Sequence, residues 1–453
     1  MNPKSNPNKR APRQPQAGAA KPQKSVSRGK ALRAQKQAVS DANRIANQYL
    51  DASAKAEQPI TPRRRANVID DSPRLKIIGL GGMDGGGSKN MMVIEYKNDA
   101  IVIDCGNDLG VDLPGINYGI ADTTYLDQIK NKLRAFVMTH GHLDHIGGLP
   151  HILPKYNVPV YGSRFTIGRV EEIFENFGPA MPEGFELKTV IMNETTHERL
   201  KIGEFFVELI RVTHSIPGST MVVVDTPVGR LINTGDFRLD PNPLDHERTD
   251  IARIEQLAKE GVLVLMSEST TTERLGRTPS ESTIEKSFID IMDNAPGRIF
   301  VAIFSTNVNR VQMIVNAAVH HGKKIAIDGR SMISTVEMAV RNGFLKIPKG
   351  TFVPISSVAS MKDDQVVIVC TGGQGEPNSA LQRMSMGDHQ HITLKEQDTV
   401  IISSTPIPYT GNDALVRAMV DDFLRKGVHV YRAETYELDH SGPLHVSGHA
   451  SQD

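Results

Sequence analysis

Residues Val137–Pro150 read VMTHGHLDHIGGLP and place three histidines and an aspartate within six positions. They follow directly on the apolar run LRAFVMT, which predicts a short buried strand. In α/β proteins, side chains for binding or catalysis are carried on loops at strand ends. Where thiolate is absent, imidazole and carboxylate are the natural ligands of Zn²⁺. The loop therefore predicts a metal site at the end of a strand.

Four such side chains on one tight loop cannot all reach a single ion without strain. The spacing favours two ions a few Å apart, with His140 and His142 facing one ion and Asp144 and His145 facing the other. Gly141 would let the backbone turn tightly between the first two ligands. Two divalent cations in this arrangement can activate water and polarise a phosphoryl or carbonyl oxygen.

A dinuclear site needs further ligands from elsewhere in the chain, and the sequence offers three candidates after apolar runs. His214 follows FFVELIRVT, and Asp236 follows LINTG. Asp104 ends the run in IVIDCG and is placed to orient a ligand histidine from behind. Taken alone, each could be an ordinary polar loop residue, so their assignment depends on the histidine-rich loop.

Length and composition restrict the class of protein. A chain of 453 residues exceeds what one hydrophobic core usually serves, so we expect two or more domains. No apolar run approaches the roughly 20 residues needed to span a bilayer, and the N-terminus lacks the apolar segment of a secretory signal. Cys105 and Cys370 are too few for a disulfide framework or a thiolate metal site. We therefore expect a cytoplasmic protein without a membrane partner.

Charge is unevenly distributed. Residues 1–70 hold 15 Lys and Arg against 4 Asp and Glu, a balance of +11 in a chain whose net charge is zero. These residues have few large apolar groups, which predicts a disordered extension, with a possible basic helix over 25–57. A basic tail on an acidic body favours a polyanion partner such as nucleic acid. A solvated arm that only aids solubility is an equal alternative.

The sequence pattern changes near residue 270. Before it the chain is rich in strands, whereas GRIFVAIFST, VNRVQMIVNAAVHHG and KKIAIDG alternate strand and helix as in a parallel βαβ unit. Between the two regions, Thr278 and Glu281 have the spacing of a capping box, with Pro279 at the first helical position. The spacing predicts a helix that begins there, and the whole pattern predicts two layered domains.

At this point the chain shows a family resemblance. THGHLDH resembles the H-x-H-x-D-H motif of the metallo-β-lactamase superfamily, and IVIDCG, His214 and TGD follow in the order of its other motifs. Residues 75–453 are similar to the ribonuclease J family of β-CASP nucleases through the segments LMSESTTTE, FSTNVNRVQ, DGRSM, CTGGQGEPNSALQRMS, SSTPIP and HVSGHAS.

The resemblance implies an α/β fold in which a β-CASP domain is inserted into a metallo-β-lactamase αββα sandwich. The expected divisions are a disordered basic extension over 1–70, the first part of the metallo-β-lactamase domain over 71–277, the β-CASP domain over 278–441, and a return to the first domain over 442–453.

The resemblance also implies metal and catalytic roles. His140, His142 and His214 would bind one ion, Asp144 and His145 the other, and Asp236 would bridge them. Asp144 counts among the catalytic residues together with Glu268 and His449. The last two would form a carboxylate–imidazole pair that donates a proton to the leaving 3′ oxygen. The ribonuclease J pattern usually has Asp where this chain has Glu268.

For the substrate, the resemblance implies that His445 and Ser447 belong to a phosphate-holding loop. Ser305 and Asn307 are weaker candidates for a 5′-phosphate pocket, because local turn bonding explains such residues equally well.

The implied activity is metal-dependent RNA hydrolysis. The family acts as a 5′→3′ exonuclease that prefers a 5′-monophosphate and as an endonuclease, in rRNA processing and mRNA decay. The implied cofactors are two divalent ions, Zn²⁺ first, with Mn²⁺ or Mg²⁺ as alternatives. The implied partners are RNA and, in the full-length protein, further copies of the same chain.

Two departures qualify the resemblance. The chain has GGMDGGGSKN where the family usually has a turn containing Gly-Glu. After HASQ the family continues to a P-V-H-G-E type strand, whose histidine completes the second metal site, and then to a C-terminal domain. We therefore expect either a truncated chain or a variant with an open second site. His389, His391 or His440 could replace that histidine in principle, but nothing in the sequence places them there.

Two other functions remain open. A non-catalytic RNA-binding or assembly subunit is favoured by the missing ligand, but the intact H-x-H-x-D-H loop counts against it. A small-molecule metallohydrolase is disfavoured by the long inserted region and by the basic tail.

Overall fold

The computed structural model describes residues 73–83, 88–108, 118–407, 411–440 and 442–452. Contacts divide the chain at Ser72, and Pro73–Asp453 forms one compact unit. The expected disordered extension over 1–70 and the possible helix over 25–57 lie outside the described residues, as does part of the segment GGMDGGGSKN.

Two sheets make up the first half of this unit. The first has six strands in the order β1-β2-β3-β6-β7-β8, antiparallel from β1 to β3 and parallel from β3 onward. Its strands are β1 Leu75–Gly81, β2 Met91–Tyr96, β3 Asp99–Ile103, β6 Leu133–Val137, β7 Val160–Gly162 and β8 Thr189–Ile191. A separate short pair joins β4 Asn107–Asp108 to β5 Gly119–Ile120.

The second sheet has five strands in the order β13-β12-β11-β10-β9, of which only β12 and β13 pair in parallel. Its strands are β9 Leu200–Ile202, β10 Phe205–Arg211, β11 Thr220–Asp225, β12 Arg230–Asn233 and β13 Val264–Met266. One buried cluster joins Ile101 and Val137 of the first sheet to Leu209 and Val222 of the second. The two sheets therefore face each other across a shared hydrophobic core.

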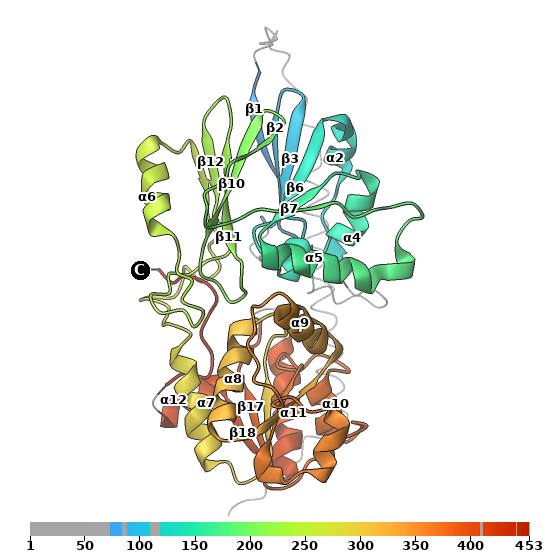
Figure 1. Ribbon diagram of the computed structural model, residues 1–453, viewed down its shortest axis with the longest axis vertical. Coiled ribbons are helices and arrows are strands. Elements are labelled where there is room, and N and C mark those ends of the chain that lie inside the picture. The colour runs from blue at the N-terminus through green and yellow to red at the C-terminus, as the bar shows by residue number, and fades with distance from the viewer. Residues whose placement is uncertain (1–72, 84–87, 109–117, 408–410, 441, 453) are drawn as a thin grey trace, which may run out of the picture. The chain divides into compact units, whose positions relative to one another are not determined.

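Helices cover the outer faces of both sheets (Figure 1). Ile167 and Val170 of α5 pack with Val102 and Phe136 of the first sheet, and α6 packs on the second sheet through Leu257. The helices are α2 Thr124–Gln128, α3 Leu143–Ile146, α4 Leu149–Ile152, α5 Arg164–Phe177 and α6 Ile251–Glu260. This is the predicted αββα sandwich.

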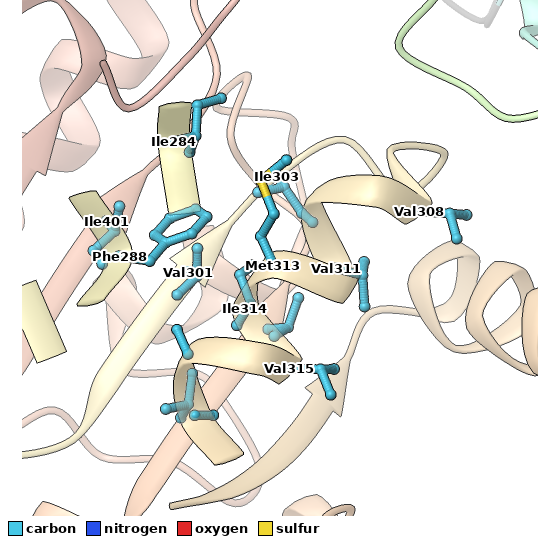
Figure 2. Close-up of a cluster of buried hydrophobic side chains, with 14 of the residues drawn as sticks. Ile284, Phe288, Val301, Ile303, Val308, Val311, Met313, Ile314, Val315 and Ile401 are labelled. Carbon is cyan, nitrogen blue, oxygen red and sulfur yellow. The ribbon is translucent and has the colours of Figure 1, made fainter. Parts of the chain in front are cut away.

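The second half is built on a parallel sheet in the order β15-β16-β14-β17-β18. Its strands are β14 Ile299–Ala302, β15 Lys324–Asp328, β16 Val366–Cys370, β17 Thr399–Ile402 and β18 His429–Arg432. Helices pack on both faces of this sheet, so it has two cores. On one face Phe288 and Met313 pack on Val301 and Ile401 (Figure 2). The predicted alternation of strand and helix is confirmed.

The helices of this half are α7 Thr283–Asn294, α8 Val308–His320, α9 Arg330–Arg341, α10 Ala380–Met386, α11 Asn412–Arg425 and α12 Ala433–Asp439. Short 3₁₀ turns lie at Lys130–Lys132, Leu153–Lys155, Gly178–Ala180, Ile355–Ser360 and Asp363–Gln365. None of the helices in the described ranges combines the length and the apolar character that crossing a membrane requires.

The predicted start of the helix near residue 278 is wrong. Helix α7 begins at Thr283, after Ser282, and has no side-chain cap. Thr278 instead donates its hydroxyl to the carbonyl of His449, 2.8 Å away. Glu281 is 2% exposed and pairs with Arg238 and Arg310. Thr278 and Glu281 have the spacing of a capping box. The Glu281 carboxylate does not cap the helix, because it forms ion pairs with Arg238 and Arg310 instead.

Candidate metal centre

The histidine-rich loop lies between β6 and α3, as the apolar run before it predicted. Gly141 is required for space rather than for an unusual backbone angle, because a Cβ there would lie 2.9 Å from the Cγ of Arg169. A second glycine, Gly106, also packs against the loop and was not identified from the sequence. A Cβ on Gly106 would lie 1.6 Å from the carbonyl oxygen of Asp144, so only glycine lets these two backbones meet.

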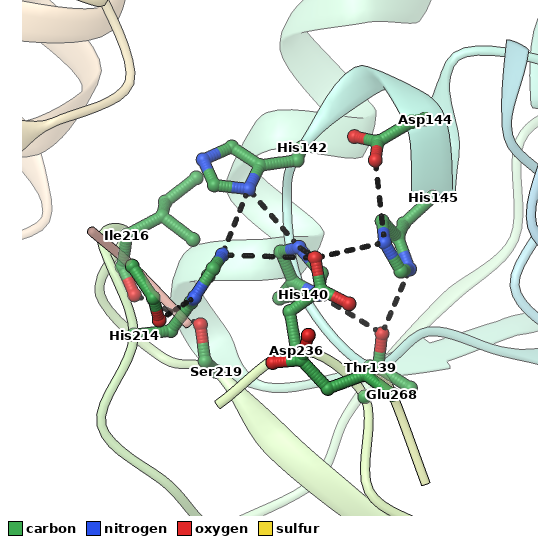
Figure 3. A network of polar contacts seen from close by, with 12 residues as sticks. Thr139, His140, His142, Asp144, His145, His214, Ile216, Ser219, Asp236 and Glu268 are labelled. Carbon is green, nitrogen blue, oxygen red and sulfur yellow. Dashed lines mark hydrogen bonds and ion pairs between the residues drawn. The ribbon is translucent and has the colours of Figure 1, made fainter. Parts of the chain in front are cut away.

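One group of ligand atoms comes from His140, His142 and His214. The Nδ1 atom of His142 lies 3.1 Å from Nε2 of His140 and 3.1 Å from Nε2 of His214 (Figure 3). His214 donates from Nδ1 to the carbonyl of Gly448 at 2.8 Å, which leaves its Nε2 as a lone pair.

Burial keeps these three imidazoles neutral. It lowers the pKa of His140 and of His214 well below the ordinary value, and it lowers the pKa of His142 to about 3. A neutral imidazole can offer a nitrogen lone pair to a metal ion, and the ligand nitrogens of these three residues lie within 4.8 Å of one another. The donor set of this group therefore fits a divalent metal ion.

The second group consists of His140, His145 and Asp236. The Oδ2 atom of Asp236 lies 3.4 Å from Nε2 of His145, 3.8 Å from Nε2 of His140 and 3.9 Å from Nε2 of His214. Although burial opposes its charge, the neighbouring His145 keeps the pKa of Asp236 well below its usual range. Asp236 thus faces both groups, which is the position that a bridging carboxylate requires.

Asp144 lies at the edge of the centre. Its Oδ2 is 3.5 Å from Nε2 of His145, and among the described residues it joins none of the converging groups. Burial and the charge of Asp236 raise its pKa to about 6, against the opposing effect of His145. The structure thus brings Asp144 to the second group without placing it among the closest ligand atoms.

Asp104 holds His145 from behind. Its Oδ2 lies 2.8 Å from Nδ1 of His145, and its Oδ1 accepts the backbone N–H of Thr139 at 2.8 Å. The backbone of Asp104 is left-handed, with φ of 60°. This contact turns Nε2 of His145 toward Asp236, as the sequence predicted for an orienting carboxylate.

Glu268 and His449 meet beside the metal ligands. Nδ1 of His449 lies 2.9 Å from Oε2 of Glu268 and 4.0 Å from Oδ2 of Asp236. Glu268 also accepts the backbone N–H of Phe237 at 2.8 Å, which fixes the carboxylate. Burial acts against a charged imidazole, but the hydrogen bond with Glu268 raises the pKa of His449. The expected carboxylate–imidazole pair is therefore formed, with Glu rather than Asp.

The four predicted substrate-binding residues lie in two different settings. Nδ1 of His445 accepts a hydrogen bond from Arg310 at 3.0 Å, and the hydroxyl of Ser447 accepts the N–H of His449 at 3.2 Å. Asn307 caps α8 through the N–H of Arg310 and donates its amide to Glu281. Ser305 is half-buried in the same loop after β14.

The three histidines named as possible replacement ligands lie elsewhere. His389 pairs with Asp328 at 2.5 Å, His391 has its ring 6.3 Å from that of His389, and His440 stacks on Tyr436. Within the described ranges none of the three joins a converging ligand group.

The thiols do not contribute to the centre. Both Cys105 and Cys370 are free and buried, and burial raises the pKa of each thiol. Among the described residues the donors are thus imidazole and carboxylate, a set that fits a divalent metal ion.

Sequence reasoning missed three residues close to this centre. Arg238, Glu281 and Arg310 form a buried ion network beside the segment that carries His449. Their partners are distant in the sequence, so no local spacing could have identified them.

Comparison with known families agrees with the fold and the centre. Residues 84–272 match the metallo-beta-lactamase superfamily, and residues 296–423 match the family described as "Ribonuclease J, beta-CASP domain". The chain therefore contains a metallo-β-lactamase domain. It combines this domain with a β-CASP domain of the ribonuclease J type.

The curated relatives carry that name. The chain is 39% identical over 386 residues to Ribonuclease J of Thermus thermophilus, covering 84% of this chain and 65% of the relative. It is 34% identical over 387 residues to Ribonuclease J2 of Bacillus subtilis, covering 84% of this chain and 66% of the relative. It covers 55% of Ribonuclease J of Helicobacter pylori strain J99, at 37% identity. The chain thus spans between about half and two thirds of the length of these relatives.

A solved structure shares the fold. The crystal structure of a protein of unknown function from Enterococcus faecalis V583 superposes with a TM-score of 0.55 at 16% identity. The match covers 83% of this chain and 89% of that one. At this identity the likeness shows the fold alone.

Proposed function

We propose that this chain is a metal-dependent ribonuclease that hydrolyses phosphodiester bonds in RNA. The observation that carries the proposal is the meeting of the two ligand groups with the Glu268–His449 pair, in a chain whose relatives are ribonucleases J. Asp236 belongs to both the second ligand group and the group with Glu268 and His449, so metal binding and proton transfer would share one place.

His140, His142 and His214 would hold one divalent ion, and His145, Asp236 and Asp144 would hold the second. When bound, such ions polarise the phosphoryl oxygen and activate water for attack on phosphorus. Asp104 accepts a hydrogen bond from Nδ1–H of His145, so the lone pair of Nε2 remains free for a metal ion. Three of these residues are already oriented by a partner at the other ring nitrogen: His140 by Thr139, His145 by Asp104 and His214 by the carbonyl of Gly448.

Glu268 would keep His449 protonated through its Nδ1 contact. Nε2 of His449 then remains to donate a proton to the 3′ oxygen as the phosphodiester bond breaks. His445 and Ser447 lie on the same segment as His449, so they are proposed to hold a phosphate of the RNA there.

Finer features are also part of the proposal. We propose 5′→3′ exonuclease activity that prefers 5′-monophosphate ends, with endonuclease activity, in rRNA processing and mRNA decay, because the resemblance to the ribonuclease J family implies it; the names of the relatives support a ribonuclease. Zn²⁺ is the proposed metal because of the imidazole-rich donors. The two free cysteines fit a reducing cytoplasm. A homo-oligomer and the divisions 71–277, 278–441 and 442–453 are proposed too, and the family matches over 84–272 and 296–423 support these divisions.

The proposal is tested by separating cleavage from binding. His142→Ala and Asp144→Ala should each lower the cleavage rate of a 5′-monophosphorylated RNA on the order of 10²–10³-fold, the loss expected when several kcal/mol of transition-state stabilisation are removed. RNA binding, measured by anisotropy, should change little. His321→Ala is the matched control, because His321 pairs with Asp293 on a helix of the parallel-sheet half. RNA binding by the wild type without any cleavage would instead favour a non-catalytic subunit.

A further inference from the structure

A buried ion network links three parts of the chain that are distant in sequence. Arg238 follows β12, Glu281 precedes α7, and Arg310 lies on α8. They are almost completely buried, with exposures of 2%, 2% and 0%. Arg310 is also the largest of the fully buried side chains. Charged residues at this depth need close partners to offset the loss of water.

Glu281 is the centre of the network. Its Oε2 accepts from Nη2 of Arg238 at 2.6 Å, and its Oε1 accepts from Nη2 of Arg310 at 2.8 Å. Asn307 donates to the same Oε1 at 3.0 Å, and Asp240 lies 3.5 Å from Arg238 as a second carboxylate. Two guanidinium groups thus face two carboxylates, so the network is balanced in charge.

Each arginine also donates to one short segment, Leu444–Ala450, which we call the return segment (Figure 1 shows the chain around it in red). Nη1 of Arg310 donates to the ring of His445 at 3.0 Å. Nη1 of Arg238 donates to the carbonyl of Ser447 at 2.9 Å. The network therefore holds the return segment at two points that are two residues apart.

The return segment in turn contacts the candidate metal centre. The carbonyl of Gly448 accepts from Nδ1 of His214, and His449 meets Glu268. A shift of the segment by one residue would separate both contacts at once. Apolar residues of similar volume could fill the space of the network, and a buried ion network adds little stability over them. They could not select one register, because only directed donors distinguish one carbonyl from the next.

We propose that Arg238, Glu281 and Arg310 are positioning residues that fix the register of the return segment. Through it they set His449 against Glu268 and the carbonyl of Gly448 against His214. None of the three needs to touch the RNA. The consequence for cleavage rests on the proposed ribonuclease function, whereas the consequence for the return segment does not.

The test uses the full chain with Arg310→Gln and Glu281→Gln, and with Arg310→Lys as a milder variant should Arg310→Gln fail to fold. Lysine keeps the charge, but it cannot donate hydrogen bonds to Glu281, His445 and the carbonyl of Ser403 at the same time, as Arg310 does. The matched control is the double variant Arg298→Gln/Asp398→Asn. This pair is also buried, bonds at 2.9 Å and links the start of β14 to the loop before β17. The other side-chain hydrogen bonds of the pair go to Thr393 and Lys395, outside the return segment.

Two readouts are taken on each variant. Hydrogen exchange measured by mass spectrometry reports amide protection in the return segment, and RNA cleavage reports kcat and KM. In the network variants, protection of the return segment should fall by roughly tenfold or more, and kcat should fall by at least about tenfold with little change in KM. The control variant should lose thermal stability to a similar degree and keep both protection and kcat.

The proposal is overturned if the return segment keeps its protection in the network variants, or if the control loses as much. Where the wild type cleaves no RNA, the ribonuclease function fails but the exchange readout still decides the positioning role. Loss of protection confined to the network variants then supports it, and equal protection in all variants overturns it.

Discussion

At the scale of single residues, Asp104 combines a left-handed backbone with two roles for one carboxylate. It accepts from the backbone of Thr139 and holds Nδ1 of His145. Asparagine adopts the left-handed conformation readily, so Asp104→Asn changes the chemistry without adding backbone strain. Its amide N–H would donate to Nδ1 of His145 and force the ring proton onto Nε2, the nitrogen that faces Asp236.

Asp104→Asn should therefore weaken metal affinity by about 10–100-fold, as measured by competition with a chelator. Asp328→Asn is the matched control, because Asp328 holds His389 at the end of β15 in the parallel sheet. Unchanged affinity in Asp104→Asn would show that His145 is not a ligand.

The pH dependence of stability should reveal the buried Glu281. Although burial opposes it, Arg310 and Arg238 lower the pKa of Glu281 to about 2 from an ordinary value of 4.5. As pH falls, the unfolded chain takes up the proton first. The stability from the ionised carboxylate is therefore complete above about pH 5 and is lost as pH falls toward about 2.

Glu281→Gln should lower the free energy of unfolding on the order of 3 kcal/mol near pH 7, because it leaves two buried arginines underpaired. The difference in unfolding free energy between the wild type and Glu281→Gln should become smaller as pH falls from about 5 to 3. The reason is that the wild type loses the stability from ionised Glu281, whereas glutamine does not titrate. Urea unfolding at several pH values measures this difference in free energy. A difference that stays constant with pH would contradict the lowered pKa of Glu281.

Local spacing explains which site residues the sequence revealed. The candidate ligands His140, His142 and His145 were recognisable because four ligand-type side chains share one loop. The contact of Arg310 with His445 joins residues 135 positions apart, and that of Arg238 with Glu281 joins residues 43 apart. No spacing rule covers such pairs, and so the ion network was missed.

At the scale of elements, strands were predictable because their apolar runs are long and bounded by turns. The start of α7 was not predictable. Thr278 and Glu281 have capping-box spacing, but in the fold they bond to His449 and Arg238, which are distant in the sequence. A local rule thus failed where two long-range contacts competed with it.

The packing of α7 on the parallel sheet gives a direct test of this element. Phe288 is fully buried against Val301 and Met313 (Figure 2). Phe288→Ala should cost about 3–5 kcal/mol of unfolding free energy through the cavity it leaves. Leu424→Ala on α11, where the side chain is 57% exposed, should change it by less than about 0.5 kcal/mol. Equal costs in denaturant unfolding would mean that α7 is not packed as described.

At the scale of the whole molecule, the candidate site is assembled from segments far apart in the chain. Asp104, His214 and Asp236 follow different strands, His449 lies on the return segment after α12, and all four meet the histidine-rich loop. Periodicity predicts each strand but not which strand ends meet. The family resemblance supplied that order, and the residues alone did not.

The basic N-terminal residues should act on RNA through charge. Replacing Arg63, Arg64 and Arg65 with glutamine removes three charges from a segment with a balance of +11. If these residues contact phosphates, the slope of log affinity against log salt should become shallower by up to about 2 units, with kcat unchanged. A slope identical to that of the wild type would leave the segment as a solubility arm.

The most direct measurement is the metal content of the purified full chain, taken together with cleavage of a 5′-monophosphorylated RNA. The chain should carry bound divalent metal, lose cleavage when a chelator removes it, and recover cleavage with added Zn²⁺ or Mn²⁺. Cleavage that survives complete removal of metal, or a fully loaded chain that cleaves no RNA, would contradict the assignment of this centre as the catalytic site of a ribonuclease.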